Sequence, residues 1–444
     1  MKFKSLVLIL LLLSSPFTLF GLTLEEEKKY GKEVFLEIAR SVPINNDPYI
    51  SVYVKTIKDR LESNTASAFP ITLTIIDSQT ADAFATIGGY VFITMGLIGM
   101  CEKEEELAGV LAHEFAHVSK RHIAKRVEKE KYINIASVAS LLAAILIPDS
   151  KAKGAILTMG MGSSQALSLK YSRDDEEEAD RVGSVIADST GYGGLGTADF
   201  LRRLRSGGGD KVLPQYLLTH PYHEERIIKL ENTWQRKKID IDTAFYPYLV
   251  ARAKILHKDA RASSEDIWIN KYVKDKTDPV NIYGASLMYA AKGDADKSVD
   301  LIVEMKSPYK NMFLGEMLVD AHRFKEAEAV LKYEAYPTSR YYLAKAYEGA
   351  GDREMAINIF GQILQYGNAY PEIYYRYGML LGRNGQEARG HEYLGRFYLE
   401  TGRLDVARSH FEKAIAKYGI NSREAADLMR AIDGMKGPPP SSKK

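Results

Sequence analysis

The sequence predicts an α+β, mainly helical domain with a small sheet, followed by an all-α solenoid of helical hairpins. Three observations support this prediction. Two short runs rich in β-branched residues precede a long helical stretch, and that stretch contains the sequence His113-Glu114-Phe115-Ala116-His117. From about residue 245 the chain changes to helical pairs with recurring Tyr and Ala. At 444 residues the chain is long enough for two or three domains.

The composition is that of a globular protein. Hydrophobic residues make up 45% of the chain and charged residues 27%. Sixty basic residues nearly balance 58 acidic ones, so no overall field directs the chain to nucleic acid. Cys101 is the single cysteine, which excludes an internal disulfide. We therefore expect a globular protein that does not bind nucleic acid.

Residues 1–21 have the order of a secretory signal peptide. Two lysines precede the apolar run 6–13, and small or helix-breaking residues follow at 14–16. The alternative is an uncleaved N-terminal anchor, although the apolar run is short for a membrane span. Export of a chain without disulfides fits a bacterial periplasm. The sequence therefore predicts an exported, periplasmic protein, with membrane attachment as the alternative.

Four segments predict the elements of the first domain, residues 22–240. Residues 24–64 have the pattern of two amphipathic helices. Residues 71–76 and 90–94 are rich in β-branched residues and predict two strands. Residues 104–129 predict one long helix, because acidic residues open it and basic residues close it.

The segment 133–169 holds two mostly apolar runs on either side of Pro148-Asp149. Neither run reaches the roughly 18 to 20 residues that a bilayer span needs. A buried helical hairpin is one interpretation of this pattern. The other is a flap or hairpin beside the active site that contacts the membrane peripherally.

The last part of the chain, residues 245–434, contains an internal repeat. The run from Tyr342 to Phe360 returns 51 residues later as Tyr393 to Phe411, and 51 is one and a half times the 34-residue tetratricopeptide period. This offset predicts a solenoid of helical hairpins, with a plain helical bundle as the alternative. Residues 435–444, rich in proline, predict a disordered tail.

The HExxH motif carries two metal ligands and a base. His113 and His117 are four residues apart and lie on one helix face, while Glu114 lies beside them and can accept a proton from water. A third ligand should come from a later helix. Glu176 and Asp180 share such a face, so Glu176 can bind the metal while Asp180 accepts the outer ring N–H of a ligand histidine.

The motifs resemble those of the HExxH metallopeptidases of the CAAX-prenyl-protease clan, most closely the BepA-like periplasmic proteases with C-terminal tetratricopeptide repeats. The matches are the HExxH motif, the segment 172–181, and Thr219-His220-Pro221 followed by Arg226. Asp82 and Ile87 depart from the family, which often has Asn and Pro there. Both departures concern the substrate-side loop and involve no ligand.

The resemblance implies one zinc ion per chain, with Glu176 as its third ligand. His220 would either close the site as a fourth ligand in a latent state or stabilise the oxyanion, and Arg226 would share the oxyanion role. An extended substrate peptide would bind by strand addition to one strand. That strand comprises Tyr90, Val91, Phe92, Ile93 and Thr94.

The function expected from these features is that of an exported zinc metalloendopeptidase. By resemblance, its clients would be misfolded or misassembled outer-membrane proteins, and it would add a chaperone-like role and association with their assembly machinery. One alternative is a membrane-attached quality-control metalloprotease. The other is a non-catalytic chaperone or scaffold with a closed zinc site, which leaves Glu114 without a purpose.

We expect His122, five residues after His117 among basic residues, to lie on the surface.

Overall fold

The computed structural model describes most of the chain. Its described ranges are 22–129, 171–207, 216–221, 224–256, 260–367 and 370–435. The predicted signal peptide, the apolar segment 133–169 and nearly all of the predicted tail lie outside the described residues. Among the helices described, none combines the length and apolar character that a membrane span requires.

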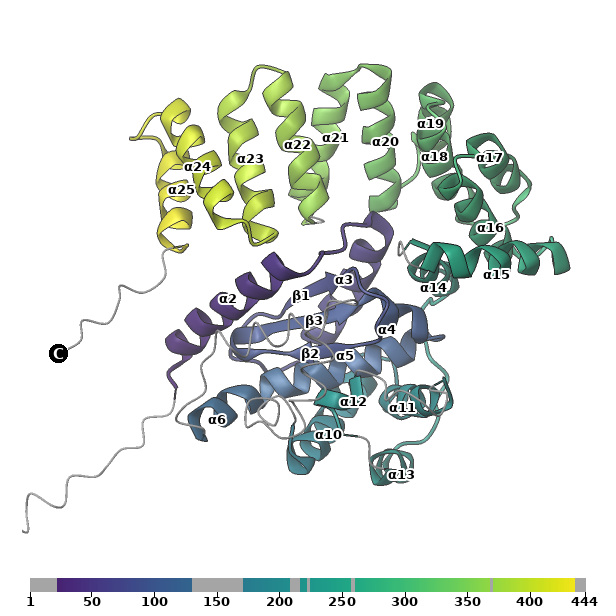
Figure 1. The fold of residues 1–444 in the computed structure, drawn as a ribbon, viewed down its shortest axis with the longest axis vertical. Coiled ribbons are helices and arrows are strands. Elements are labelled where there is room, and N and C mark those ends of the chain that lie inside the picture. Colours follow the sequence, from purple (N-terminus) through teal and green to yellow (C-terminus); the bar gives the residue numbers. More distant parts are fainter. Residues whose placement is uncertain are drawn as a thin grey trace, which may run out of the picture.

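The N-terminal half is a small sheet surrounded by helices (Figure 1). Helices α2 (Leu24–Ser41) and α3 (Pro48–Glu62) precede the strands β1 (Thr72–Ile76), β2 (Ala83–Ala85) and β3 (Tyr90–Thr94). The remaining elements of this half are η1 (Ile87–Gly89), α4 (Met95–Met100), α5 (Glu104–Ser119), α6 (His122–Lys129), α10 (Arg173–Ser189), α11 (Gly196–Gly207), α12 (Tyr216–Thr219) and α13 (Glu224–Thr233). The two predicted helices and two predicted strands are confirmed, whereas β2 and α4 were not predicted.

The sheet has the strand order β1-β3-β2. Strand β3 is parallel to β1 and antiparallel to β2, so both of its edges are hydrogen-bonded. A strand in this position has no free edge for a peptide. The prediction that an extended substrate adds to this strand is therefore wrong for its five residues, Tyr90, Val91, Phe92, Ile93 and Thr94.

The long helix predicted over residues 104–129 is two helices. The break is at Arg121, whose φ of 54° lies in the left-handed region that residues other than glycine seldom adopt. Contacts with the N-terminal segment hold Arg121 there: its guanidinium pairs with Glu27 and donates to the Leu22 carbonyl oxygen at 3.0 Å. The single-helix prediction is wrong because these contacts come from residues far away in the sequence.

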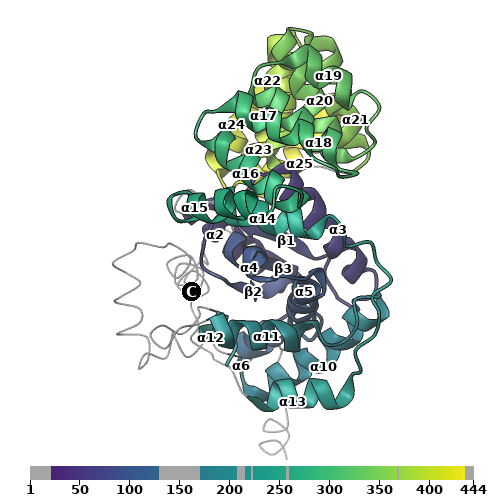
Figure 2. The same cartoon turned by 90° about the vertical axis from the view of Figure 1, so that its right-hand side faces the viewer.

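The repeat half forms an arch of helical hairpins over the N-terminal half (Figure 1), and the view turned by 90° shows the two halves stacked (Figure 2). The predicted helical solenoid is confirmed. Its turns use the recurrent glycines: Gly351, Gly385 and Gly402 have φ of 90°, 77° and 74°. The helices are α14 (Tyr246–Leu256), α15 (Ala260–Lys274), α16 (Pro279–Ala291), α17 (Ala295–Glu304), α18 (Lys310–Asp320), α19 (Phe324–Leu331), α20 (Pro337–Ala350), α21 (Arg353–Gln365), α22 (Pro371–Arg383), α23 (Glu387–Glu400), α24 (Leu404–Tyr418) and α25 (Arg423–Asp433).

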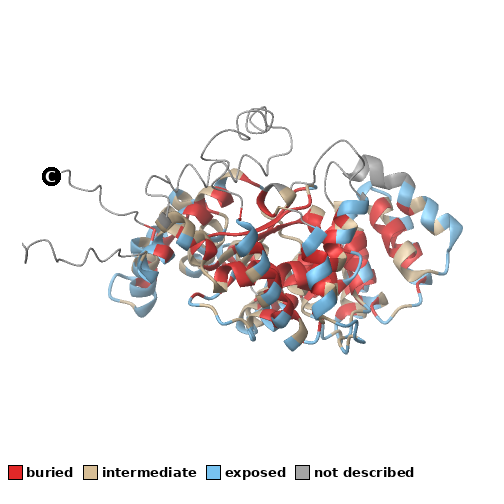
Figure 3. Cartoon of the chain, turned by 90° about the horizontal axis from the view of Figure 1, so that it is seen from below, coloured by how far each residue is buried: buried red, intermediate tan, exposed pale blue. Residues whose placement is uncertain are grey.

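Helix α14 contributes to the cores of both halves, whose buried residues are coloured red in Figure 3. Tyr246 and Leu249 pack in the core around the sheet, while Tyr248 and Ile255 pack in the core of the repeats. Conversely, Tyr49 of α3, which belongs to the N-terminal half, packs in the repeat core. The two halves are therefore joined by shared packing as well as by the chain.

A buried ion-pair network reinforces this junction. The Arg252 guanidinium on α14 pairs with Asp47, which caps α3, through Nη2 and Oδ2 at 2.6 Å. It also pairs with Glu316 of α18 through Nη2 and Oε1 at 2.7 Å. The hydroxyl of Tyr342 on α20 donates to the same Glu316 oxygen at 2.7 Å. Two carboxylates from the two halves thus share one buried cation.

Replacing Arg252 by Ala should destabilise the whole chain. Removing the cation leaves Asp47 and Glu316 buried without a partner, and breaking a buried ion pair from one side costs about 3–5 kcal/mol. Urea unfolding should show this loss, whereas Arg383→Ala, an exposed arginine on α22, should change stability by less than about 0.5 kcal/mol. Equal stability of both variants would contradict a structural role for the network.

Candidate active site

Helix α5 carries the HExxH motif through the interior of the N-terminal half. His113, Glu114 and His117 are all buried. Helix α10 lies against them with very little space between the backbones, because a Cβ added at Gly183 would lie only 2.8 Å from the Cα of His113. This close approach brings the acidic side chains of α10 to the histidines.

Ser172 caps the start of helix α10: its hydroxyl accepts from the Asp175 N–H while the Asp175 carboxylate accepts from the Ser172 N–H. This capping box fixes the start and the rotation of the helix. As a result Glu176 and Asp180, four residues apart, face α5 and are buried. Glu177, one residue further along, is exposed and pairs with Lys229 at 2.7 Å.

Four buried side chains bring their ligand atoms together. The Nε2 atoms of His113 and His117 are 3.0 Å apart, and His220 Nδ1 lies 3.4 Å from His113 Nε2. Glu176 Oε1 lies 3.0 Å from His220 Nδ1 and 3.4 Å from His117 Nε2. All four atoms lie within 4.8 Å of one another. Ligands about 2.0–2.1 Å from a zinc ion in tetrahedral geometry are about 3.3 Å apart, so these residues fit zinc.

The charge states of the cluster also suit a cation. Burial lowers the pKa of His117 well below its usual range, so the ring is neutral, as a ligand must be. Burial alone would raise the pKa of Glu176, but His220 and Arg226 hold it well below its usual range. Burial opposes a proton on His220, yet Glu114 and Glu176 raise its pKa to about 9. Binding of a metal ion here displaces that proton.

Asp180 lies behind the first histidine. Its Oδ1 is 2.9 Å from His113 Nδ1, the ring nitrogen that faces away from the cluster. Such a contact fixes the tautomer and orientation of a ligand histidine. Burial alone would raise the pKa of Asp180, but Arg226 and His113 lower it to about 2. The sequence-derived pairing of Asp180 with a ligand histidine matches this geometry.

The Arg226 guanidinium contacts the two carboxylates of α10, those of Glu176 and Asp180. Its Nε and Nη2 donate to Asp180 at 2.7 and 2.8 Å, and Nη1 contacts Glu176. Nη1 also donates to the Pro221 carbonyl oxygen at 3.3 Å. The guanidinium is therefore occupied in holding the two acidic residues of α10 and the loop that follows His220.

Glu114 lies beside the ligand cluster without being part of it. Burial raises the pKa of its carboxyl group. Its Oε1 is 3.3 Å from His220 Nε2, so His220 reaches the ligand cluster with one ring nitrogen and the base with the other. A carboxylate with a raised pKa next to a metal site is suited to accept a proton.

His122 is buried, and the prediction that it lies on the surface is wrong. Its Nδ1 is 2.8 Å from His117 Nδ1, and its Nε2 is 3.2 Å from Glu178 Oε2. The turn at Arg121 is the cause, since it folds α6 back toward the motif. His122 thus supports the second ligand histidine, as Asp180 supports the first.

Two tyrosines that the sequence analysis missed pack on the histidine rings. Tyr171 stacks on His117 with ring centroids 3.7 Å apart, and Tyr216 stacks on His220 at 4.4 Å. The Tyr171 hydroxyl also donates to the Ala85 carbonyl oxygen at 3.3 Å, which links the site to β2. No motif or spacing marks these tyrosines, because they meet the rings only through the tertiary fold.

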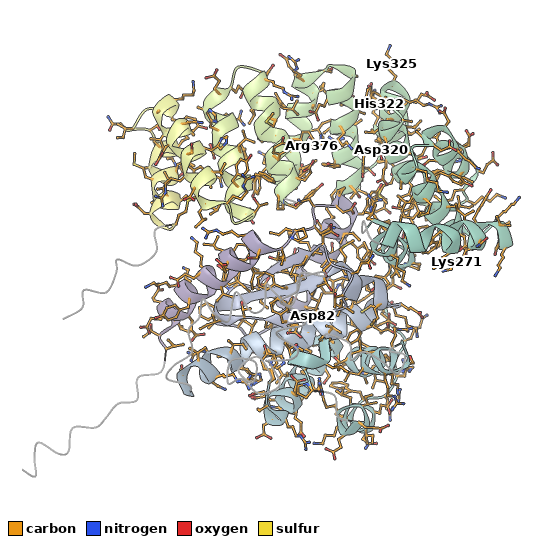
Figure 4. All side chains as sticks on the ribbon, in the orientation of Figure 1. Asp82, Lys271, Asp320, His322, Lys325 and Arg376 are labelled. Atoms are coloured by element: carbon orange, nitrogen blue, oxygen red, sulfur yellow. The ribbon has the colours of Figure 1, made fainter. Side chains whose placement is uncertain are left out.

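The remaining candidate residues lie in both halves of the chain. Asp82, where the resembling family often has Asn, lies in the N-terminal half, and His322 lies in the repeat arch near the turn between α18 and α19 (Figure 4). His391 and His410 contact each other within the repeats, with their Nδ1 atoms 3.0 Å apart. His223, which follows His220 by three residues, lies outside the described residues.

Curated proteins from several bacteria are similar to the chain. The beta-barrel assembly-enhancing protease of Yersinia pestis is 26% identical over 94% of this chain and 89% of its own length. The corresponding protein of Escherichia coli K12 is 24% identical over the same shares. A Vibrio cholerae protein named provisionally for the same role is 31% identical over 67% of this chain, which spans 64% of its length.

The family model for Peptidase family M48 matches residues 48–234. That range contains the HExxH motif, Glu176, Asp180, His220 and Arg226. The predicted enzyme class and the predicted zinc cofactor are thereby confirmed, and the chain carries a zinc metallopeptidase domain of family M48 in front of its helical repeats.

Proposed function

We propose that the chain is an exported zinc endopeptidase that cleaves misfolded or misassembled β-barrel proteins of the outer membrane. The observation that carries the proposal is the buried base Glu114 beside a four-residue ligand cluster. The names of the relatives from Yersinia pestis and Escherichia coli support the client class. The order of residues 1–21 supports export to the periplasm.

Zinc bound by His113, His117 and Glu176 would supply a Lewis acid for the scissile carbonyl and a water whose pKa is lowered to about 7. Glu114 accepts the proton of the attacking water, aided by the raised pKa of its carboxyl group, and returns it to the leaving amine. Asp180 and His122 hold the outer nitrogens of the two ligand histidines in place.

His220 acts as a latch in this proposal. Its Nδ1 lies among the ligand atoms, at the position a fourth ligand occupies, and His220 stands between the end of the short helix α12 and Pro221. A site closed by four protein ligands has no room for water, so the ring must move before catalysis. Arg226, which we expected at the oxyanion, serves as a positioning residue for Asp180 and Glu176.

The substrate peptide adds to β2 in this proposal. Strand β2 is an outer strand of the sheet, and its described backbone pairs with β3 on one side only. Tyr171, which stacks on His117, reaches the carbonyl of Ala85 in β2. A peptide extended along β2 would therefore pass the ligand cluster, as strand addition at a sheet edge allows.

The repeat arch would hold the client while the site cleaves it, and it is the surface through which the chain would associate with the outer-membrane assembly machinery. Helical repeat arrays present long concave surfaces of this kind. A chaperone activity that needs no cleavage would also depend on this arch. The variant Glu114→Gln separates that chaperone activity from proteolysis.

Glu114→Gln should retain zinc and lose proteolysis. The amide keeps the size of the side chain but cannot accept the proton. Zinc content by mass spectrometry of the native protein should equal that of the wild type, while cleavage of an unfolded β-barrel client should fall by at least about 100-fold. Full proteolysis with unchanged zinc would exclude Glu114 as the base and overturn the mechanism.

Glu176→Ala should lose zinc and activity, whereas Glu177→Ala should lose neither. The two residues are neighbours on α10, but only Glu176 is buried against the histidines. Zinc content and client cleavage measured for the pair give the answer directly. Retention of zinc by Glu176→Ala would remove this residue from the ligand set.

His220→Ala separates the latch from an oxyanion group, because the two roles predict opposite signs. If His220 closes the resting site, its removal should raise client cleavage or cause self-cleavage with zinc retained. If it stabilises the oxyanion, turnover should fall about 100-fold or more. Unchanged turnover and zinc would exclude both roles.

A further inference from the structure

The outer edge of β1 has backbone groups that are left open between two occupied ends. At one end, the Ile75 carbonyl oxygen accepts from the Asn45 N–H at 2.8 Å. At the other end, the Ile71 N–H donates to the Glu62 side chain at 2.6 Å. Backbone groups of alternate residues in a strand point to the same side, so the N–H and C=O of Leu73 also point outward. No hydrogen bond from the described residues reaches these two groups.

A cavity of about 310 Å³ lies along this open edge. Its walls come from both halves of the chain, and six of the lining residues define its character: Val54, Lys55 and Lys58 of α3, and Tyr370, Pro371 and Tyr374 at the start of α22. Tyr370 is more than nine-tenths buried, and its hydroxyl meets no hydrogen-bond partner in the described parts of the chain. The cavity therefore joins open backbone donors and acceptors to an aromatic wall with an unpaired hydroxyl.

We propose that this cavity binds an extended polypeptide segment, which adds to β1 as a further strand. The chemistry that fits is a strand with alternating apolar and polar side chains, because Leu73 offers backbone hydrogen bonds and the two tyrosines offer apolar contact on one face. Transmembrane strands of unassembled β-barrels have this alternation. The choice of occupant rests on the proposed function, while the binding mode rests on the open edge.

The docking site is separate from the catalytic centre. Strands β1 and β2 lie at opposite edges of the sheet, so their backbones are roughly 10 Å apart, or two strand spacings. The ligand cluster is linked to β2 through Tyr171 and Ala85. A segment on β1 is therefore held without being cut, between the sheet and the repeat arch.

The test measures binding of a fluorescein-labelled ten-residue peptide with alternating apolar and polar residues to the full chain. All proteins carry Glu114→Gln, so that the peptide stays intact. Leu73→Pro removes the outward N–H, and proline is tolerated where that N–H faces away from the sheet. Fluorescence polarisation should show binding at least about tenfold weaker for Leu73→Pro. Leu73→Ala, which keeps the N–H, should stay within about threefold of the parent.

A second pair of variants guards against misfolding of the strand. Tyr374→Ala removes part of the aromatic wall and should also weaken binding, whereas Tyr375→Ala, its exposed neighbour on α22, should not.

Alkylation by a bromoacetyl form of the peptide supplies an independent readout. Because the sole cysteine, Cys101, is buried, Thr72→Cys offers one accessible thiol at the edge, and Thr56→Cys offers one on α3 outside the cavity. Alkylation should favour Thr72→Cys.

The outcomes separate this proposal from the proposed function. Equal affinity for the proline and alanine variants, with equal alkylation at the two thiols, would overturn the docking site. Cleavage of an unfolded β-barrel client by the chain without Glu114→Gln tests the peptidase itself. Absence of that cleavage, with tight and edge-dependent peptide binding, would refute the proposed protease function and support the docking site.

Discussion

The approach of α10 to α5 is the contact on which the catalytic centre depends. At Gly183 the two backbones leave no space for a side chain, since a Cβ would lie 2.8 Å from the Cα of His113. An alanine there would force the helices apart, and overpacking of this kind costs about 1–3 kcal/mol. The consequence for chemistry is larger than for stability, because Glu176 reaches the histidines only at this separation.

Charge then decides how the packed side chains are arranged. Two buried carboxylates on α10 face two histidines, and Arg226 neutralises them from behind. Buried charges without partners are costly, so the arginine and a cation between the ligands together make this acidic cluster compatible with burial. This explains why the Arg226 guanidinium contacts both Asp180 and Glu176.

The sequence was sufficient for the residues that follow helical spacing. His113, His117, Glu176 and Asp180 could be assigned because positions four apart share a helix face, and the structure brings them together. His122 could not, since a left-handed Arg121 held by Glu27 interrupts the spacing.

The order of the strands could not be predicted from the sequence either. Strand β2 has three residues and no alternation, so nothing in the sequence indicated that it covers one side of β3 and turns the predicted peptide-binding strand into a central one. The stacking of Tyr171 and Tyr216 on the histidines also depends on the assembled fold alone.

The repeats and the peptidase half share buried side chains and are not packed as independent units. Helix α14 buries side chains in both cores, and Asp47 both caps α3 and pairs with Arg252. Helix α3 in turn packs on α5, which carries the catalytic motif. Removing the repeats from residue 245 onward would strip α14 from the core around the sheet and leave Asp47 without its cation. The repeat arch and the catalytic helix are therefore held by one continuous set of buried contacts, which fixes the position of the arch relative to the HExxH motif.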